Sequence, residues 1–258
     1  MSLRHLIFLV LFYLGGGIFT SFGFLRHKDL GASYFRVHGL GLCVSLFLAY
    51  WLLGRAYLDP STSLWFSLFL VCATFFSFFT GVSHSVSATS FFLGTISYYG
   101  ALFFDLSTTS LGANQAILFS NSILASLVLG FSMAAMALGH WYLIQPKLSI
   151  AELKRITLLL ILFLVLRLLF SSYQIGMLIQ GMGEMDLYRY FMKVPGVFIL
   201  MRYVWGIWGA LILSWLVWRT VQIRSTQSAT GILYVVVVAC LVGEILSLYL
   251  AFYFGLPL

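Results

Sequence analysis

The nine residues from Leu158 to Leu166 are all leucine, isoleucine, phenylalanine or valine, and similar apolar stretches recur along the whole chain. Of the 258 residues, 62% are hydrophobic and only 8% are charged, whereas soluble domains carry about 25% charged residues. A helix needs ~20 apolar residues to cross the hydrocarbon core of a bilayer. The sequence therefore excludes a soluble globular protein and predicts an all-α, polytopic membrane helix bundle.

Eight apolar segments alternate with polar or charged interruptions, and each predicts a membrane-spanning helix. A membrane β-barrel is excluded, because its strands alternate polar and apolar residues over ~10 positions, whereas these segments are apolar on every side. We expect a single transmembrane domain of residues 1–258 with almost no mass outside the membrane. The predicted spans are 5–25, 37–54, 63–82, 88–106, 116–140, 155–176, 195–218 and 230–254.

Two connections between these spans contain residues that predict local structure. Ser149 and Glu152 have the spacing of a capping box just before an apolar run, which predicts a helix that starts close to Ile150. The connection from Met177 to Lys193 is long enough to hold a short helix that lies on the membrane surface.

Lysine and arginine are distributed unevenly over the two sides of the predicted bundle. Basic residues accumulate in the cytoplasmic loops of membrane proteins. We therefore expect the side with more lysine and arginine to face the cytoplasm and both termini to lie on the opposite side. The expected location is a bacterial inner membrane. The net charge of +7 thus indicates topology, and nucleic-acid binding is not expected, because the charges form no basic helix. The richer side holds Arg26, Lys28, Arg36, Lys147, Lys154, Arg155, Arg219 and Arg224, and the other holds Arg4, Arg55, Arg189 and Lys193.

Three ionisable side chains stand out inside the predicted spans: Arg167, Arg202 and Glu244. A charge at bilayer depth costs a few kcal/mol or more, so it usually has a partner or a function. At about 1.5 Å of rise per residue, Arg167 and Glu244 reach similar depths, which permits an ion pair between the sixth and eighth spans. Two interpretations stay open: a structural pair that fixes helix packing, or groups that contact a quinone or relay a proton.

Three histidines lie near span ends on the predicted cytoplasmic side: His38, His84 and His140. Imidazoles can hydrogen-bond a quinone carbonyl or ligate haem iron, but interfacial histidines beside Trp141 and Tyr142 are also typical of an aromatic belt. Haem b is less favoured than a quinone, since axial ligands normally stand well inside two apolar helices. No motif predicts a metal site or a catalytic centre.

The last two spans contain short motifs that resemble a known family. The segments are Phe198–Gly206 (FILMRYVWG), Leu211–Trp218 (LILSWLVW) and Leu241–Tyr253 (LVGEILSLYLAFY). They are similar to the end of the eight-helix, quinol-binding membrane anchor subunits of the dimethyl sulfoxide reductase and polysulfide reductase type. Those anchors carry an arginine early in the seventh helix and a Gly-Glu step in the eighth, which correspond here to Arg202 and Glu244.

The resemblance implies a non-catalytic subunit without metal that binds menaquinol or ubiquinol and anchors a peripheral iron–sulfur protein. Our leading hypothesis is therefore an integral-membrane subunit of a respiratory or electron-transfer complex that interacts with quinone. Its expected partners are other membrane subunits, a peripheral redox subunit and lipid. The alternatives are a small proton-coupled secondary transporter and a purely structural membrane subunit. The candidate quinone contacts or proton-relay residues are Arg167, Arg202, Glu244, His38, His84 and His140.

Overall fold

The computed structural model describes residues 3–54, 58–108, 114–145, 148–181 and 194–258, and these residues form helices without any strand. The long apolar runs favour helices because a helix satisfies its own backbone hydrogen bonds in lipid. The helices are α1 (Leu3–Phe22), α2 (His27–Leu30), α3 (Ala32–Ala49), η1 (Tyr50–Gly54), α4 (Pro60–Phe79), α5 (His84–Thr108), α6 (Gln115–Ile144), α7 (Ala151–Gln180), α9 (Val194–Met201), η2 (Arg202–Gly209), α10 (Ala210–Gln222) and α11 (Thr226–Phe254).

Seven helices within the described ranges are long and apolar enough to cross a membrane, which confirms the predicted helical membrane bundle. They are α1, α3 continued by η1, α4, α6, α7, the continuous helix Pro195–Gln222, and α11. The fourth predicted span, 88–106, lies in α5, which is not among these seven but has 25 residues, or ~37 Å of helix. The chain is an integral membrane protein, and apolar side chains on its outer surface contact lipid.

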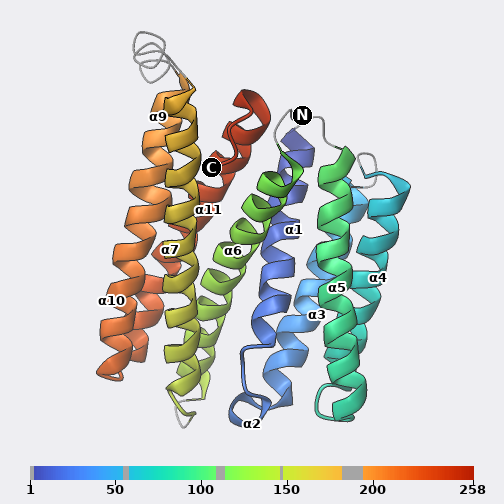
Figure 1. Ribbon diagram of the computed structural model, residues 1–258. Helices are drawn as coiled ribbons and strands as arrows, with labels where there is room; N and C mark the ends of the chain where they lie inside the picture. The colour runs from blue at the N-terminus through green and yellow to red at the C-terminus, as the bar shows by residue number, and fades with distance from the viewer. Residues whose placement is uncertain (1–2, 55–57, 109–113, 146–147, 182–193) are drawn as a thin grey trace.

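The long helices run antiparallel to their neighbours in the chain, and the start of α1 lies at the same end of the bundle as the end of α11 (Figure 1). The connections predicted to be cytoplasmic are gathered at the opposite end. This arrangement agrees with an even number of crossings, and the assignment of that end to the cytoplasm stays a prediction.

The start of α7 differs in detail from its prediction. The helix begins at Ala151, next to the expected Ile150, but the capping box does not form. Glu152 is instead fully buried, and its carboxylate accepts the backbone N–H of Arg26 and pairs with Arg155, each at 3.1 Å. Glu152 therefore ties the connection after α1 to α7. Most of the predicted surface helix, residues 182–193, lies outside the described ranges.

The helix α1 packs against α3, α5 and α6, and three consecutive glycines, Gly15–Gly17, permit this. The first faces Leu46 of α3, and the second lies under the ring of Tyr98 of α5. A Cβ atom on Gly17 would lie only 1.9 Å from the backbone oxygen of Ser126 in α6. Only glycine allows this approach of two helix backbones.

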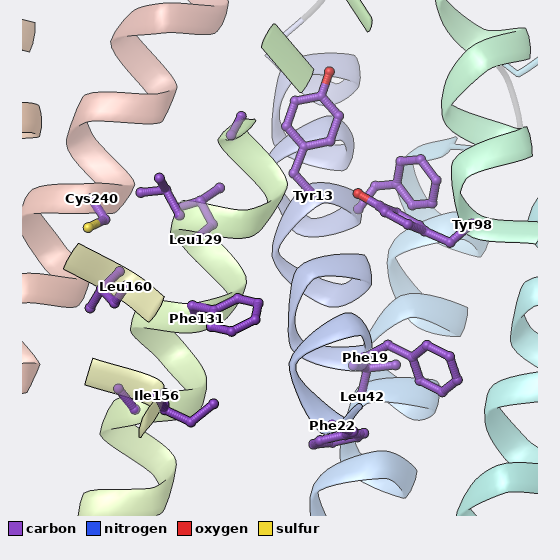
Figure 2. Close-up of a cluster of buried hydrophobic side chains, with 14 of the residues drawn as sticks. Tyr13, Phe19, Phe22, Leu42, Tyr98, Leu129, Phe131, Ile156, Leu160 and Cys240 are labelled. Carbon is purple, nitrogen blue, oxygen red and sulfur yellow. The ribbon is translucent and has the colours of Figure 1, made fainter. Parts of the chain in front are cut away.

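A chain of hydrogen bonds crosses the bundle at this level. Tyr98 extends from α5 toward α1 (Figure 2), and its hydroxyl donates to Ser126 Oγ at 2.7 Å. Ser126 Oγ in turn donates to the backbone oxygen of Tyr13 at 3.0 Å, and the Tyr13 hydroxyl bonds Ser122 Oγ at 2.9 Å. These buried polar groups therefore link α5, α1 and α6 at fixed positions.

Candidate functional site

Arg167 of α7 and Glu244 of α11 form an ion pair inside the bundle. Arg167 Nη2 lies 2.5 Å from Glu244 Oε2, and Arg167 Nε donates to Oε1 at 3.1 Å. The two side chains are 1% and 3% exposed. A guanidinium that contacts both oxygens of a carboxylate makes the strongest and most directional type of ion pair. The structure thus shows the pair that the similar depths of the two residues permitted.

Arg167 also donates hydrogen bonds to two further residues, one on α6 and one on α11. Its Nη1 donates to the backbone oxygen of Asn121 at 3.1 Å and to the Oδ1 atom of that side chain at 2.6 Å. Its Nη2 also donates to Ser247 Oγ at 3.1 Å. Arg167 therefore joins α6, α7 and α11. Asn121 was not among the predicted site residues, although it is the only amide side chain in the span 116–140.

Arg202 brings a second guanidinium to the same carboxylate. It is fully buried at the start of η2, where Nη1 donates to the backbone oxygen of Gly243 and Nη2 lies 3.5 Å from Glu244 Oε1. The contact is close because Gly206 faces Gly243: a Cβ atom on Gly206 would lie 2.5 Å from the Cα atom of Gly243. Two arginines thus share one carboxylate where η2 and α11 touch backbone to backbone.

These three charged residues are enclosed by protein. None of them lines any of three cavities among the described residues, two beside histidines and one between α7 and α9. A ligand in those cavities therefore has no direct contact with Arg167, Arg202 or Glu244. This geometry favours the structural interpretation, in which the charges fix the packing of α6, α7, η2 and α11.

The histidines lie in different places from this cluster and from one another. His84 starts α5, is exposed, and lines a cavity of about 490 Å³ together with His27 of α2. Burial lowers the pKa of His27, and the neighbouring His84 lowers it further. His140 is exposed near the end of α6. His38 lines a separate cavity between α1, α3 and α6.

The cavity at His38 has a volume of about 310 Å³ and a mainly apolar lining. On its α3 side, Val37, Gly41 and Ser45 are exposed on the outer surface of the bundle, so the cavity opens on a surface that faces lipid. The residues that line it are Leu11, Leu14, Gly15, Ile18, Phe22, Tyr34, Val37, His38, Gly41, Leu42, Ser45, Leu46, Met133, Ala134 and Ala137.

One hydrogen bond determines which ring nitrogen of His38 can bind a ligand. Nδ1 lies 2.8 Å from the backbone oxygen of Tyr34. Because a carbonyl oxygen only accepts hydrogen bonds, Nδ1 carries the proton. In the neutral imidazole, Nε2 is then an acceptor. Sequence patterns identified His38 as a candidate, but they did not indicate this tautomer.

In the described part of the chain, no group of three or more histidine, cysteine, aspartate or glutamate residues is placed to hold a metal ion. Comparison with known protein families, curated proteins and solved structures gave no significant match. The resemblance of residues 198–253 to quinol-binding anchor subunits therefore stays a prediction.

Proposed function

We propose that this protein is a quinol-binding membrane subunit of an electron-transfer complex, with its quinol site in the cavity between α1, α3 and α6. The observation that carries the proposal is the lipid-facing opening of this apolar cavity, combined with the acceptor nitrogen of His38. Isoprenoid quinols reach a protein from the bilayer, bury an apolar ring and tail, and present a hydroxyl group. The apolar lining of the cavity suits the ring and the tail, and the acceptor nitrogen of His38 suits the hydroxyl group.

The size of the cavity fits such a ligand, since small-molecule sites have volumes of roughly 300–1,000 Å³. Ubiquinol and menaquinol both suit its chemistry. The charged cluster stands apart from it: Asn121, which binds Arg167, precedes the lining residue Ala134 by 13 positions, or about 20 Å along α6. In this proposal Arg167, Arg202 and Glu244 hold α6 in place, His38 binds the ligand, and a peripheral redox subunit receives the electrons.

Replacing Gly41 by leucine tests the location of the site. Gly41 lines the cavity, and a Cβ atom there would meet no atom within 4 Å. The new side chain should therefore fill the cavity without displacing a helix. We expect the affinity for decylubiquinol and for a short-chain menaquinol, measured by titration of the protein in nanodiscs, to fall at least tenfold.

Gly231→Leu is the matched control, because Gly231 also has no atom within 4 Å of a Cβ position but lines none of the described cavities. It should bind both quinols as tightly as the unmodified protein. If neither quinol binds the unmodified protein, or if Gly41→Leu binds them equally well, the proposed function is wrong.

Replacing His38 by phenylalanine tests the chemistry of the site. Phenylalanine keeps a ring against Tyr34 and Trp141, which lie 4.3 and 5.8 Å from the His38 ring centre, but it cannot accept a hydrogen bond. A hydrogen bond contributes about 1 kcal/mol, so we expect the affinity for decylubiquinol to fall about five- to tenfold. The affinity for decylubiquinone should change little, because neutral His38 has no free donor. Equal losses for the two forms would contradict the assigned tautomer.

A further inference from the structure

Ser45 is a second polar residue that a ligand in the proposed quinol cavity can reach. The lining of this cavity contains three polar side chains, those of Tyr34, His38 and Ser45. Tyr34 is only 1% exposed, whereas His38 is half-buried and Ser45 is exposed. Of these three lining residues, His38 and Ser45 are therefore the ones whose side chains a ligand can contact.

The hydroxyl group of Ser45 acts as a hydrogen-bond acceptor toward a ligand. It donates its own proton to the backbone oxygen of Gly41 at 2.7 Å, a bond that serine often forms with the carbonyl four residues earlier in a helix. A hydroxyl group has one proton to donate and two lone pairs. Because the proton is used within α3, Ser45 Oγ accepts a hydrogen bond from a ligand, as His38 Nε2 does.

The two acceptors have the spacing of the two ends of a quinol ring. His38 and Ser45 are seven positions apart on α3, which places them on one face of the helix with a rise of about 10 Å between them. Between them Gly41 has no side chain, and no atom lies within 4 Å of its Cβ position. A hydroquinone ring with a hydrogen bond of about 2.8 Å at each oxygen spans roughly 11 Å. The ring therefore fits lengthwise along α3, over Gly41.

We propose that one quinol hydroxyl donates to His38 Nε2, that the other donates to Ser45 Oγ, and that this pair of acceptors makes the site selective for the reduced ligand. The inference rests on the proposed function and adds a specificity-determining residue, Ser45, to it. A quinol has a proton to donate at each of its two oxygens, so it forms both hydrogen bonds. A quinone has two carbonyl oxygens that only accept, so it forms neither.

The test compares the affinities for decylubiquinol and decylubiquinone, measured by titration of the protein in nanodiscs. The unmodified protein should bind decylubiquinol more than about tenfold more tightly, since two hydrogen bonds distinguish the two forms. Ser45→Ala should lower the affinity for decylubiquinol about fivefold and leave the affinity for decylubiquinone unchanged, which also shows that the cavity is intact. When Ser45→Ala is combined with His38→Phe, the two affinities should become about equal.

Ser67→Ala is the matched control. Ser67 is exposed on α4, its hydroxyl donates to the backbone oxygen of Ser63 at 2.8 Å, and it lines none of the three cavities; both affinities should be unchanged. If decylubiquinol binds no more tightly than decylubiquinone, or if Ser45→Ala changes both affinities equally or not at all, the inference fails. The proposed function still stands in that case, provided that Gly41→Leu weakens binding. If neither form binds, both fail.

Discussion

Replacing Glu244 by glutamine is expected to lower the free energy of unfolding by about 3–5 kcal/mol, the range found when one partner of a buried ion pair is removed. Glutamine has nearly the same shape but no charge. In the variant, the guanidinium groups of Arg167 and Arg202, both fully buried, would face an uncharged amide. The measurement is a titration of the purified protein with sodium dodecyl sulfate in mixed micelles, followed by circular dichroism.

Arg202→Gln is the matched comparison for this prediction. It removes the longer contact of 3.5 Å and leaves the pair between Arg167 and Glu244 at 2.5 Å. The expected loss is about 1–3 kcal/mol, because the variant loses one hydrogen bond to the backbone oxygen of Gly243 and the longer contact with Glu244. If Glu244→Gln lowers the free energy of unfolding no more than Arg202→Gln does, the carboxylate of Glu244 does not neutralise the charges of both arginines.

Replacing Gly17 by alanine should lower the free energy of unfolding by about 3 kcal/mol, the upper part of the usual range for overpacking. The new methyl group would lie 1.9 Å from the backbone oxygen of Ser126 and 2.8 Å from the Cα atom of Gly130. Both atoms belong to the backbone of α6, so no side-chain rotation relieves the contact. The two helices must separate, and the same detergent titration measures the cost.

Gly176→Ala is the control for this substitution. Gly176 lies within α7, and a Cβ atom there would meet no atom within 4 Å. Alanine is favoured over glycine inside a helix by about 1 kcal/mol, so the variant should be as stable as the unmodified protein or slightly more stable. Equal behaviour of the two alanine variants would contradict the close contact of α1 and α6.

The helical class could be predicted because runs such as Leu158–Leu166 are long and apolar, and a segment must be both to cross a bilayer. The ends of the helices were harder to predict. The predicted span 155–176 lies inside α7, Ala151–Gln180, because a helix continues into the polar interface, where apolar composition no longer marks it. Ser149 and Glu152 matched a capping box, but tertiary contacts with Arg26 and Arg155 used the carboxylate instead.

The candidate site was predictable only in part. Charged residues are rare in the spans, and the similar depths of Arg167 and Glu244 indicated that these two could pair. The π-helical segment η2, which presents Arg202 to Gly243, has no signature in a helical period of 3.6 residues. The cavity at His38 depends on α1 lying between α3 and α6, and helices that are apolar on all sides do not encode their neighbours.

The contact between α1 and α6 also has a consequence for how the chain is made. The ribosome must add 92 residues between Phe22, the end of α1, and Gln115, the start of α6, which takes about 5–20 s at typical rates of synthesis. Throughout that interval the backbone of α1 at Gly17 is open to lipid or to the insertion machinery. Helix α1 therefore enters the membrane well before its neighbour α6 exists, and a nascent chain arrested before α6 should be a preferred target for membrane proteases.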